Sequence, residues 1–140
     1  HYPPVTPVFK AGAARRGTAT IYVSANPSAH SMHPAEADRR TGATTIETLS
    51  LADVFADYSV DRCDLLKLDC EGAEYEILDA LPDDVWPRIG RIVMEFHPVE
   101  GGSADWTGPA LAKRLESHGF RVELLPHPKH PTKGHLFASR

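Results

Sequence analysis

The chain has 140 residues, 41% of them hydrophobic, and it is expected to bury one core as a single domain over residues 1–140. Its 15 Lys and Arg are outnumbered by 19 Asp and Glu, and no segment concentrates positive charge, which argues against a nucleic-acid partner. No run approaches the ~20 apolar residues of a membrane span, and the two cysteines lack a Cys-x-x-Cys spacing. We therefore expect a cytoplasmic protein with reduced thiols and no membrane partner.

The N-terminal third has the composition of strands interrupted by a loop. Residues 5–13 and 18–24 are β-rich and flank a turn-like break at 14–17, which predicts a hairpin or two adjacent strands. Residues 26–42 are rich in Pro, Ser and His without any periodicity, so we expect a long surface loop. Residues 44–48 are β-branched and are expected to be extended.

A helix is predicted from Ser50 to about Tyr58. Ser50 and Asp53 have the spacing of a capping box, and Leu49 and Val54 are placed to form a hydrophobic staple across the helix start. The apolar residues recur at the spacing of one helical face and are expected in the core, namely Leu51, Val54, Phe55 and Tyr58.

The second half of the chain alternates strands and helices. Residues 64–68 form a nearly continuous apolar strand, typical of one covered on both faces, and a helix over 72–81 should follow. The residues of this helix expected in the core are Ala73, Ile77, Leu78 and Leu81. A second apolar strand, 91–96, precedes a helix over 109–118.

The C-terminal helix has clear end signals, since Thr107 can cap its start and Gly119 can stop it. The alternating residues 120–124 and the segment 135–139 then predict an antiparallel hairpin. This order of elements predicts an α/β fold with parallel strands at the centre of its sheet.

Charged and imidazole side chains follow both central strands. Asp69 and Glu71 come directly after the first strand, while Glu95 and His97 lie at the end of the second. Strands linked by one helix usually pair side by side, and ligands bind at their carboxyl ends, so these four side chains are expected to share a crevice. Such a set would suit general acid or base catalysis on a substrate hydroxyl, or a divalent ion such as Mg²⁺.

A purely structural interpretation stays open for the same residues. Glu71 and Glu74 would fall in the first turn of a helix, where carboxylates are stabilising whatever the protein does. Glu95 can pair with a nearby Lys or Arg, and His97 can be an ordinary loop histidine. We favour this interpretation over a metal site and assign no metal ligands.

Other chemical motifs are weak or absent from the sequence. His127, His130 and His135 match no zinc-binding spacing and are expected in a surface loop. Neither the Gly-x-Gly-x-x-Gly nor the Walker pattern of a phosphate-binding loop occurs.

Residues 64–78 read Asp-Leu-Leu-Lys-Leu-Asp-Cys-Glu-Gly-Ala-Glu-Tyr-Glu-Ile-Leu and resemble the signature strand and helix of the FkbM-type S-adenosylmethionine-dependent methyltransferases. Residues 14–23, 45–54 and 92–97 are similar to the elements that flank this signature in the family. Ser50 stands where the family commonly has Asp, a tolerable exchange at a helix cap. The resemblance implies that the chain is the C-terminal part of a methyltransferase domain.

The fold that the resemblance implies is a partial class I, Rossmann-like sheet, mostly parallel with an antiparallel C-terminal hairpin. The strand at 64–69 would be central, and the family's first strand and glycine-rich loop would lie upstream of His1. We therefore expect the upstream half of the same domain as a partner, and poor binding of S-adenosylmethionine by these 140 residues alone.

The activity that the resemblance implies is methyl transfer from S-adenosylmethionine to a hydroxyl of a sugar or small natural product. Asp69 and Glu71 would lie at the cofactor, and Glu95 or His97 would serve as the base. The alternatives are a non-catalytic α/β assembly or regulatory module and, less favoured, a metal-dependent hydrolase that uses the same side chains.

Overall fold

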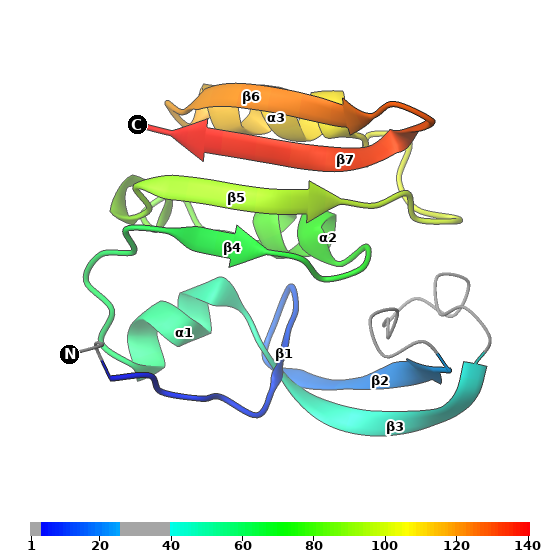
Figure 1. The fold of residues 1–140 in the computed structure, drawn as a ribbon. Coiled ribbons are helices and arrows are strands. Elements are labelled where there is room, and N and C mark those ends of the chain that lie inside the picture. The colour runs from blue at the N-terminus through cyan, green and yellow to red at the C-terminus, as the bar shows by residue number, and fades with distance from the viewer. Residues whose placement is uncertain (1–3, 26–39) are drawn as a thin grey trace.

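The computed structural model describes residues 4–25 and 40–140 (Figure 1). The strands are β1 (Ala11–Gly12), β2 (Gly17–Ser24), β3 (Arg40–Leu49), β4 (Leu66–Leu68), β5 (Arg91–Phe96), β6 (Arg121–His127) and β7 (His130–Ser139). The helices are α1 (Leu51–Asp57), α2 (Glu74–Asp79) and α3 (Gly108–Ser117), with a short 3₁₀ helix, η1 (Trp86–Arg88). None of the described helices is long and apolar enough to cross a membrane.

The described strands form two mixed sheets, with the orders β1-β3-β2 and β4-β5-β7-β6. The α/β prediction is confirmed, as are the parallel pairing of β4 with β5 and the antiparallel β6–β7 hairpin. The mostly parallel sheet is not confirmed. A short turn joins β6 to β7 and makes them antiparallel, and β7 then enters the sheet antiparallel to β5.

The prediction that the first two strands form a hairpin or lie next to each other is wrong, because β3 lies between them. β1 and β2 both pair with β3, and Ala11 and Gly17 lie opposite Thr48 from its two sides. The Thr48 hydroxyl donates a hydrogen bond to the carbonyl of Arg15, 2.9 Å away, and so ties the intervening turn to β3. Of the predicted loop at 26–42, residues 26–39 lie outside the described part, and β3 already begins at Arg40.

The capping box of α1 is confirmed. The Ser50 hydroxyl accepts a hydrogen bond from the Asp53 N–H at 3.1 Å, and the Ser50 N–H donates to the Asp53 carboxylate at 2.9 Å. The Ser50 hydroxyl also donates to the Asp53 carboxylate at 2.7 Å. This hydrogen bond, then those from the Ser50 N–H and from Arg16, lower the pKa of Asp53 to about 2. Phe55 is buried as expected, whereas Tyr58 at the helix end is 42% exposed.

Replacing Ser50 with Ala should lower the free energy of unfolding by about 1 kcal/mol, because the Asp53 N–H in the first turn of α1 loses the hydroxyl that caps it. Chemical denaturation measures this loss. Ser117→Ala is the matched control, since the Ser117 hydroxyl is exposed and only donates back to the Arg114 carbonyl. Equal losses in the two variants would contradict the capping role.

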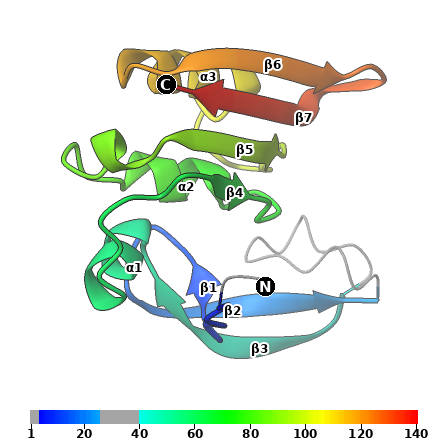
Figure 2. The same ribbon diagram turned by 60° about the vertical axis from the view of Figure 1, so that its left-hand side comes forward.

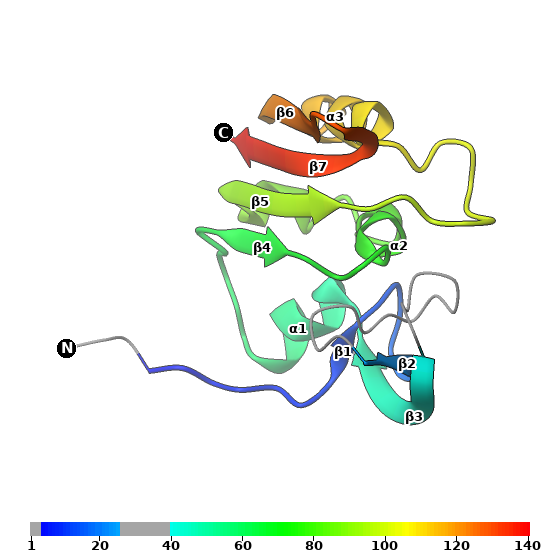
Figure 3. The ribbon, with the colours of Figure 1, turned by 45° about the vertical axis from the view of Figure 1, so that its right-hand side comes forward.

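Helices α2 and α3 cover one face of the four-stranded sheet, as Figures 2 and 3 show from two sides. Strand β5 alternates accordingly, with Ile92, Met94 and Phe96 buried beneath these helices. The core residues predicted for the helix over 72–81, which the structure forms as the shorter α2, are buried as expected, namely Ala73, Ile77, Leu78 and Leu81. The cap of α3 by Thr107 is also confirmed, and Gly119 follows the helix with a φ of 85°.

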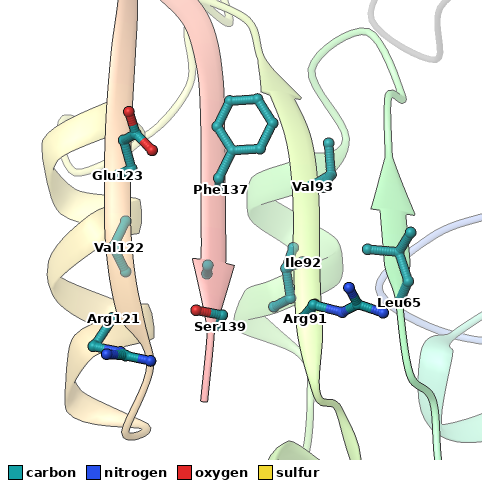
Figure 4. A pocket seen from close by; sticks show the side chains of 10 residues that line it. Leu65, Arg91, Ile92, Val93, Arg121, Val122, Glu123, Phe137 and Ser139 are labelled. Carbon is teal, nitrogen blue, oxygen red and sulfur yellow. The ribbon is translucent and has the colours of Figure 1, made fainter.

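The opposite face of this sheet is open within the described residues. A shallow groove of about 460 Å³ runs across it, with Leu65, Val93 and Phe137 among the side chains that line it (Figure 4). Leu65 is 51% exposed, so the prediction that its strand is covered on both faces is not confirmed. β4 lies at an edge of the described sheet; the central position and the neighbour expected upstream of His1 stay predictions.

Candidate functional site

The carboxyl ends of β4 and β5 carry the predicted site residues. Glu95 alternates with the buried Met94 and Phe96, so its side chain shares the open face with that of Val93, and His97 follows directly after β5. Asp69 directly follows β4, which runs parallel to β5. The carboxyl ends of two adjacent parallel strands thus bring the candidate residues to one end of the sheet.

The chain between β4 and α2 makes a turn with unusual backbone angles. Glu71 has a φ of 50° and Gly72 a φ of 105°, so two consecutive residues are left-handed. This conformation costs a non-glycine residue such as Glu71 of order 1 kcal/mol, and such residues concentrate at functional sites. It also delays the start of α2 to Glu74, so the prediction that Glu71 lies in the first helical turn is wrong.

Glu74 holds this turn together from the protein interior. Its side chain is fully buried, and its two oxygens accept hydrogen bonds from the backbone N–H groups of Cys70 at 2.7 Å and Gly72 at 2.9 Å. The same carboxylate lies 3.2 Å from Nδ1 of His97. Sequence reasoning missed this role, because a helix expected to begin at residue 72 left Glu74 as an ordinary first-turn acid.

His97 is the centre of the site. Its side chain is only 12% exposed, and its Nε2 lies 3.5 Å from a Glu95 oxygen and 3.6 Å from a Glu71 oxygen. Burial opposes a charged imidazole, but the hydrogen bond to Glu74 and the charges of Glu74, Glu71 and Glu95 outweigh it and raise the pKa of His97. His97 therefore makes specific contacts to three carboxylates and is not an ordinary loop histidine.

The three remaining candidates surround His97. Glu95 faces His97 and, at 4.0 Å, His135 of β7, so its described ion-pair partners are histidines and not the expected Lys or Arg. Burial above all raises the pKa of the Glu71 carboxyl; His97 opposes this shift, and the acidic neighbours add to it. Asp69 is more exposed and pairs with Lys67 at 3.0 Å. The structure thus brings together all four residues predicted from the sequence.

The geometry permits two kinds of chemistry. Asp69, Glu95 and His97 each offer one ligand atom, and these atoms lie within 4.8 Å of one another, close enough for a divalent cation to bridge them. Without a cation, the same groups form a cluster of negative charge around one imidazole that can take up a proton. The exposed histidines of the β6–β7 turn, His127 and His130, lie outside this cluster and stack on each other at 5.2 Å.

A small apolar pocket also borders the β4–α2 turn. Its volume is about 140 Å³, and its lining includes Leu68, Cys70 and Ile77 beside residues of β1 and α1. Burial raises the pKa of the Cys70 thiol, which keeps it in the neutral form. The pocket and the carboxylate cluster therefore flank the same turn with opposite polarity.

Comparison with known proteins identifies the family signature along most of the chain. The profile described as "Methyltransferase FkbM domain" matches residues 6–122. The 31-O-demethyl-FK506 methyltransferase FkbM of Streptomyces tacrolimicus is 37% identical over 79 residues, which are 55% of this chain and 28% of that protein. Methyltransferase sdnD of Sordaria araneosa is 31% identical over 97 residues, which are 61% and 36% of the two chains.

A third relative shows the domain within a much larger protein. The AMB antimetabolite synthetase AmbE of Pseudomonas aeruginosa is 34% identical over 74 residues, which are 53% of this chain but only 4% of that protein. The matches therefore span between 4% and 36% of the length of these three relatives. No solved structure matches the chain.

Proposed function

The chain belongs to the FkbM methyltransferase domain family, and on this premise we propose that it forms part of an S-adenosylmethionine-dependent O-methyltransferase. The proposed acceptor is a hydroxyl group of a sugar or small natural product. The name of one relative, 31-O-demethyl-FK506 methyltransferase, gives an O-demethyl compound as its substrate and supports transfer to an oxygen.

The charge of the site supports a cationic methyl donor. Asp69, Glu71 and Glu95 gather at the carboxyl ends of β4 and β5, where Lys67 and the imidazoles of His97 and His135 only partly balance them. S-adenosylmethionine supplies a methyl group on a positively charged sulfonium, which such a cluster would favour electrostatically. The donor also carries an adenine ring, and the apolar pocket beside Cys70 offers a surface on which such a ring could lie.

His97 is the proposed general base, with Glu95 beside it. In its neutral form, Nε2 of His97 can take the proton of an acceptor hydroxyl as the oxygen forms its new bond to carbon. The carboxylates of Glu71 and Glu95, 3.6 and 3.5 Å from Nε2, would then stabilise the imidazolium. The protein contributes orientation, charge and removal of water, which are the main requirements of an in-line displacement.

The convergence of Asp69, Glu71, Glu95 and His97 is the observation that carries this proposal. The remaining donor contacts, including a glycine-rich loop, would come from polypeptide outside these 140 residues, in line with the small share of the relatives that the chain spans. The same convergence supports a second candidate, a metal-dependent hydrolase, through the three potential ligand atoms within 4.8 Å.

Incubation of the full-length protein with methyl-labelled S-adenosylmethionine and a panel of hydroxylated sugars and natural products tests the proposal. We expect label on an acceptor oxygen, and loss of transfer in Asp69→Ala and Glu71→Ala. Unchanged transfer in both variants together with lower melting temperatures would favour a structural role for these acids. Hydrolysis that depends on an added divalent cation, without any methyl transfer, would favour the second candidate.

A further inference from the structure

A fully buried carboxylate lies directly behind the proposed base. Glu74 has no exposed surface, although a buried carboxylate is costly unless hydrogen bonds replace its hydration. It makes three such contacts, two to backbone N–H groups of the turn and one to Nδ1 of His97. The contact to His97 is the only one of the three that leads into the site.

The two backbone contacts fix the direction in which the carboxylate points. The N–H groups of Cys70 and Gly72 lie on either side of the left-handed Glu71 and bind one oxygen of Glu74 each, at 2.7 and 2.9 Å. The oxygen that accepts from Cys70 is also the one 3.2 Å from Nδ1 of His97. The turn therefore orients Glu74, and Glu74 in turn orients the imidazole ring.

We propose that Glu74 is a positioning residue that holds neutral His97 in the tautomer with its proton on Nδ1. An ionised carboxylate only accepts hydrogen bonds, so Nδ1 must carry the proton that it shares with Glu74. The free nitrogen is then Nε2, which faces the open site beside Glu95 and Glu71. A neutral histidine in water favours the opposite tautomer, so this arrangement requires a partner such as Glu74.

The catalytic meaning of this inference rests on the proposed function, because only a base needs its free nitrogen to face a substrate. The geometry itself does not rest on the proposed function, since Glu74 makes its hydrogen bonds within the protein and without a methyl acceptor. The described charged groups around the ring come from several elements: Glu71 in the turn, Glu74 at the start of α2, Glu95 on β5 with His135 of β7 behind it, and Asp69 after β4 with Lys67 of that strand. Of these, Glu74 alone contacts Nδ1.

The ¹⁵N chemical shifts of the His97 ring test the inference in the unmodified full-length protein. At a pH at which His97 is neutral, we expect the shift pattern of a protonated Nδ1 and a free Nε2. The opposite pattern would overturn the proposal without the need for any variant. Because this measurement needs no substrate, it stands even if no methyl transfer is found.

Glu74→Gln then tests the effect on the reaction, with Glu76→Gln in the same helix as the matched control. The amide of Glu74→Gln must direct its NH₂ group at one of the N–H donors that the carboxylate served. We expect a mixture of His97 tautomers and a kcat lowered about 10²-fold, the low end of what an oriented base contributes, with KM little changed. A folded Glu74→Gln protein with the original tautomer and kcat would refute the positioning role.

Discussion

Replacing His97 with Asn should lower the rate of methyl transfer by about 10²- to 10⁴-fold, the range that a general base contributes. Asn is close to imidazole in size and polarity but cannot take up a proton at neutral pH. His127→Asn is the matched control, because His127 lies at the exposed β6–β7 turn outside the carboxylate cluster. Steady-state kinetics with a saturating donor measures both. Equal rates in the two variants would remove His97 from the mechanism.

The pH dependence of this rate follows from the charges around His97. The hydrogen bond to Glu74 and the charges of Glu74, Glu71 and Glu95 outweigh burial and raise the pKa of His97 above its ordinary value of 6.5. Since only the neutral ring is a base, the rate should rise with pH through this raised pKa and then level off. The rising limb should disappear in His97→Asn. A rate that falls over this range would contradict the assignment.

Stability should change in the opposite direction over the same pH range. A pKa that is higher in the folded than in the unfolded protein means that protonated His97 stabilises the fold. This stabilisation is fully present below the unfolded pKa of about 6.5. It is lost as the pH rises through the pKa of His97 in the folded protein. The free energy of unfolding of the protein therefore falls over the pH range in which His97 becomes an active base. Such a trade-off between stability and activity is common in enzymes.

The local features of the fold could be predicted from the sequence, and the features that depend on distant contacts could not. The capping box of Ser50 and the stop at Gly119 depend on a few consecutive residues and were predicted correctly. Nothing local shows that β3 lies between β1 and β2, because that pairing depends on backbone hydrogen bonds between segments far apart in the chain. For the same reason, the sequence does not show that β7 lies between β5 and β6 in the sheet.

The candidate site shows the same division. The family signature and the rule that ligands bind at strand ends were enough to select Asp69, Glu71, Glu95 and His97. They were not enough to find the role of Glu74, because its burial follows from the left-handed turn, and that turn is stabilised by Glu74 itself. A residue whose conformation and contacts depend on each other gives no separate signal in the sequence.

Replacing Phe96 with Ala should lower the free energy of unfolding by about 3–5 kcal/mol, the cost of removing a buried aromatic ring and leaving a cavity. Phe96 is 1% exposed and packs on the first residue of α3, where a Cβ on Gly108 would lie only 2.7 Å from its ring. The absence of a side chain at Gly108 lets the ring fill this space, so its removal leaves a cavity there.

Phe137→Ala is the matched control for this prediction, because Phe137 belongs to the same sheet but is 39% exposed on its open face. Chemical denaturation should give it a much smaller loss. Phe96 also separates Glu95 from His97 in the chain and anchors the end of β5 between them. Its removal should therefore lower methyl transfer even under conditions in which the protein is folded. A large loss of stability with full activity would show that the site does not depend on this anchor.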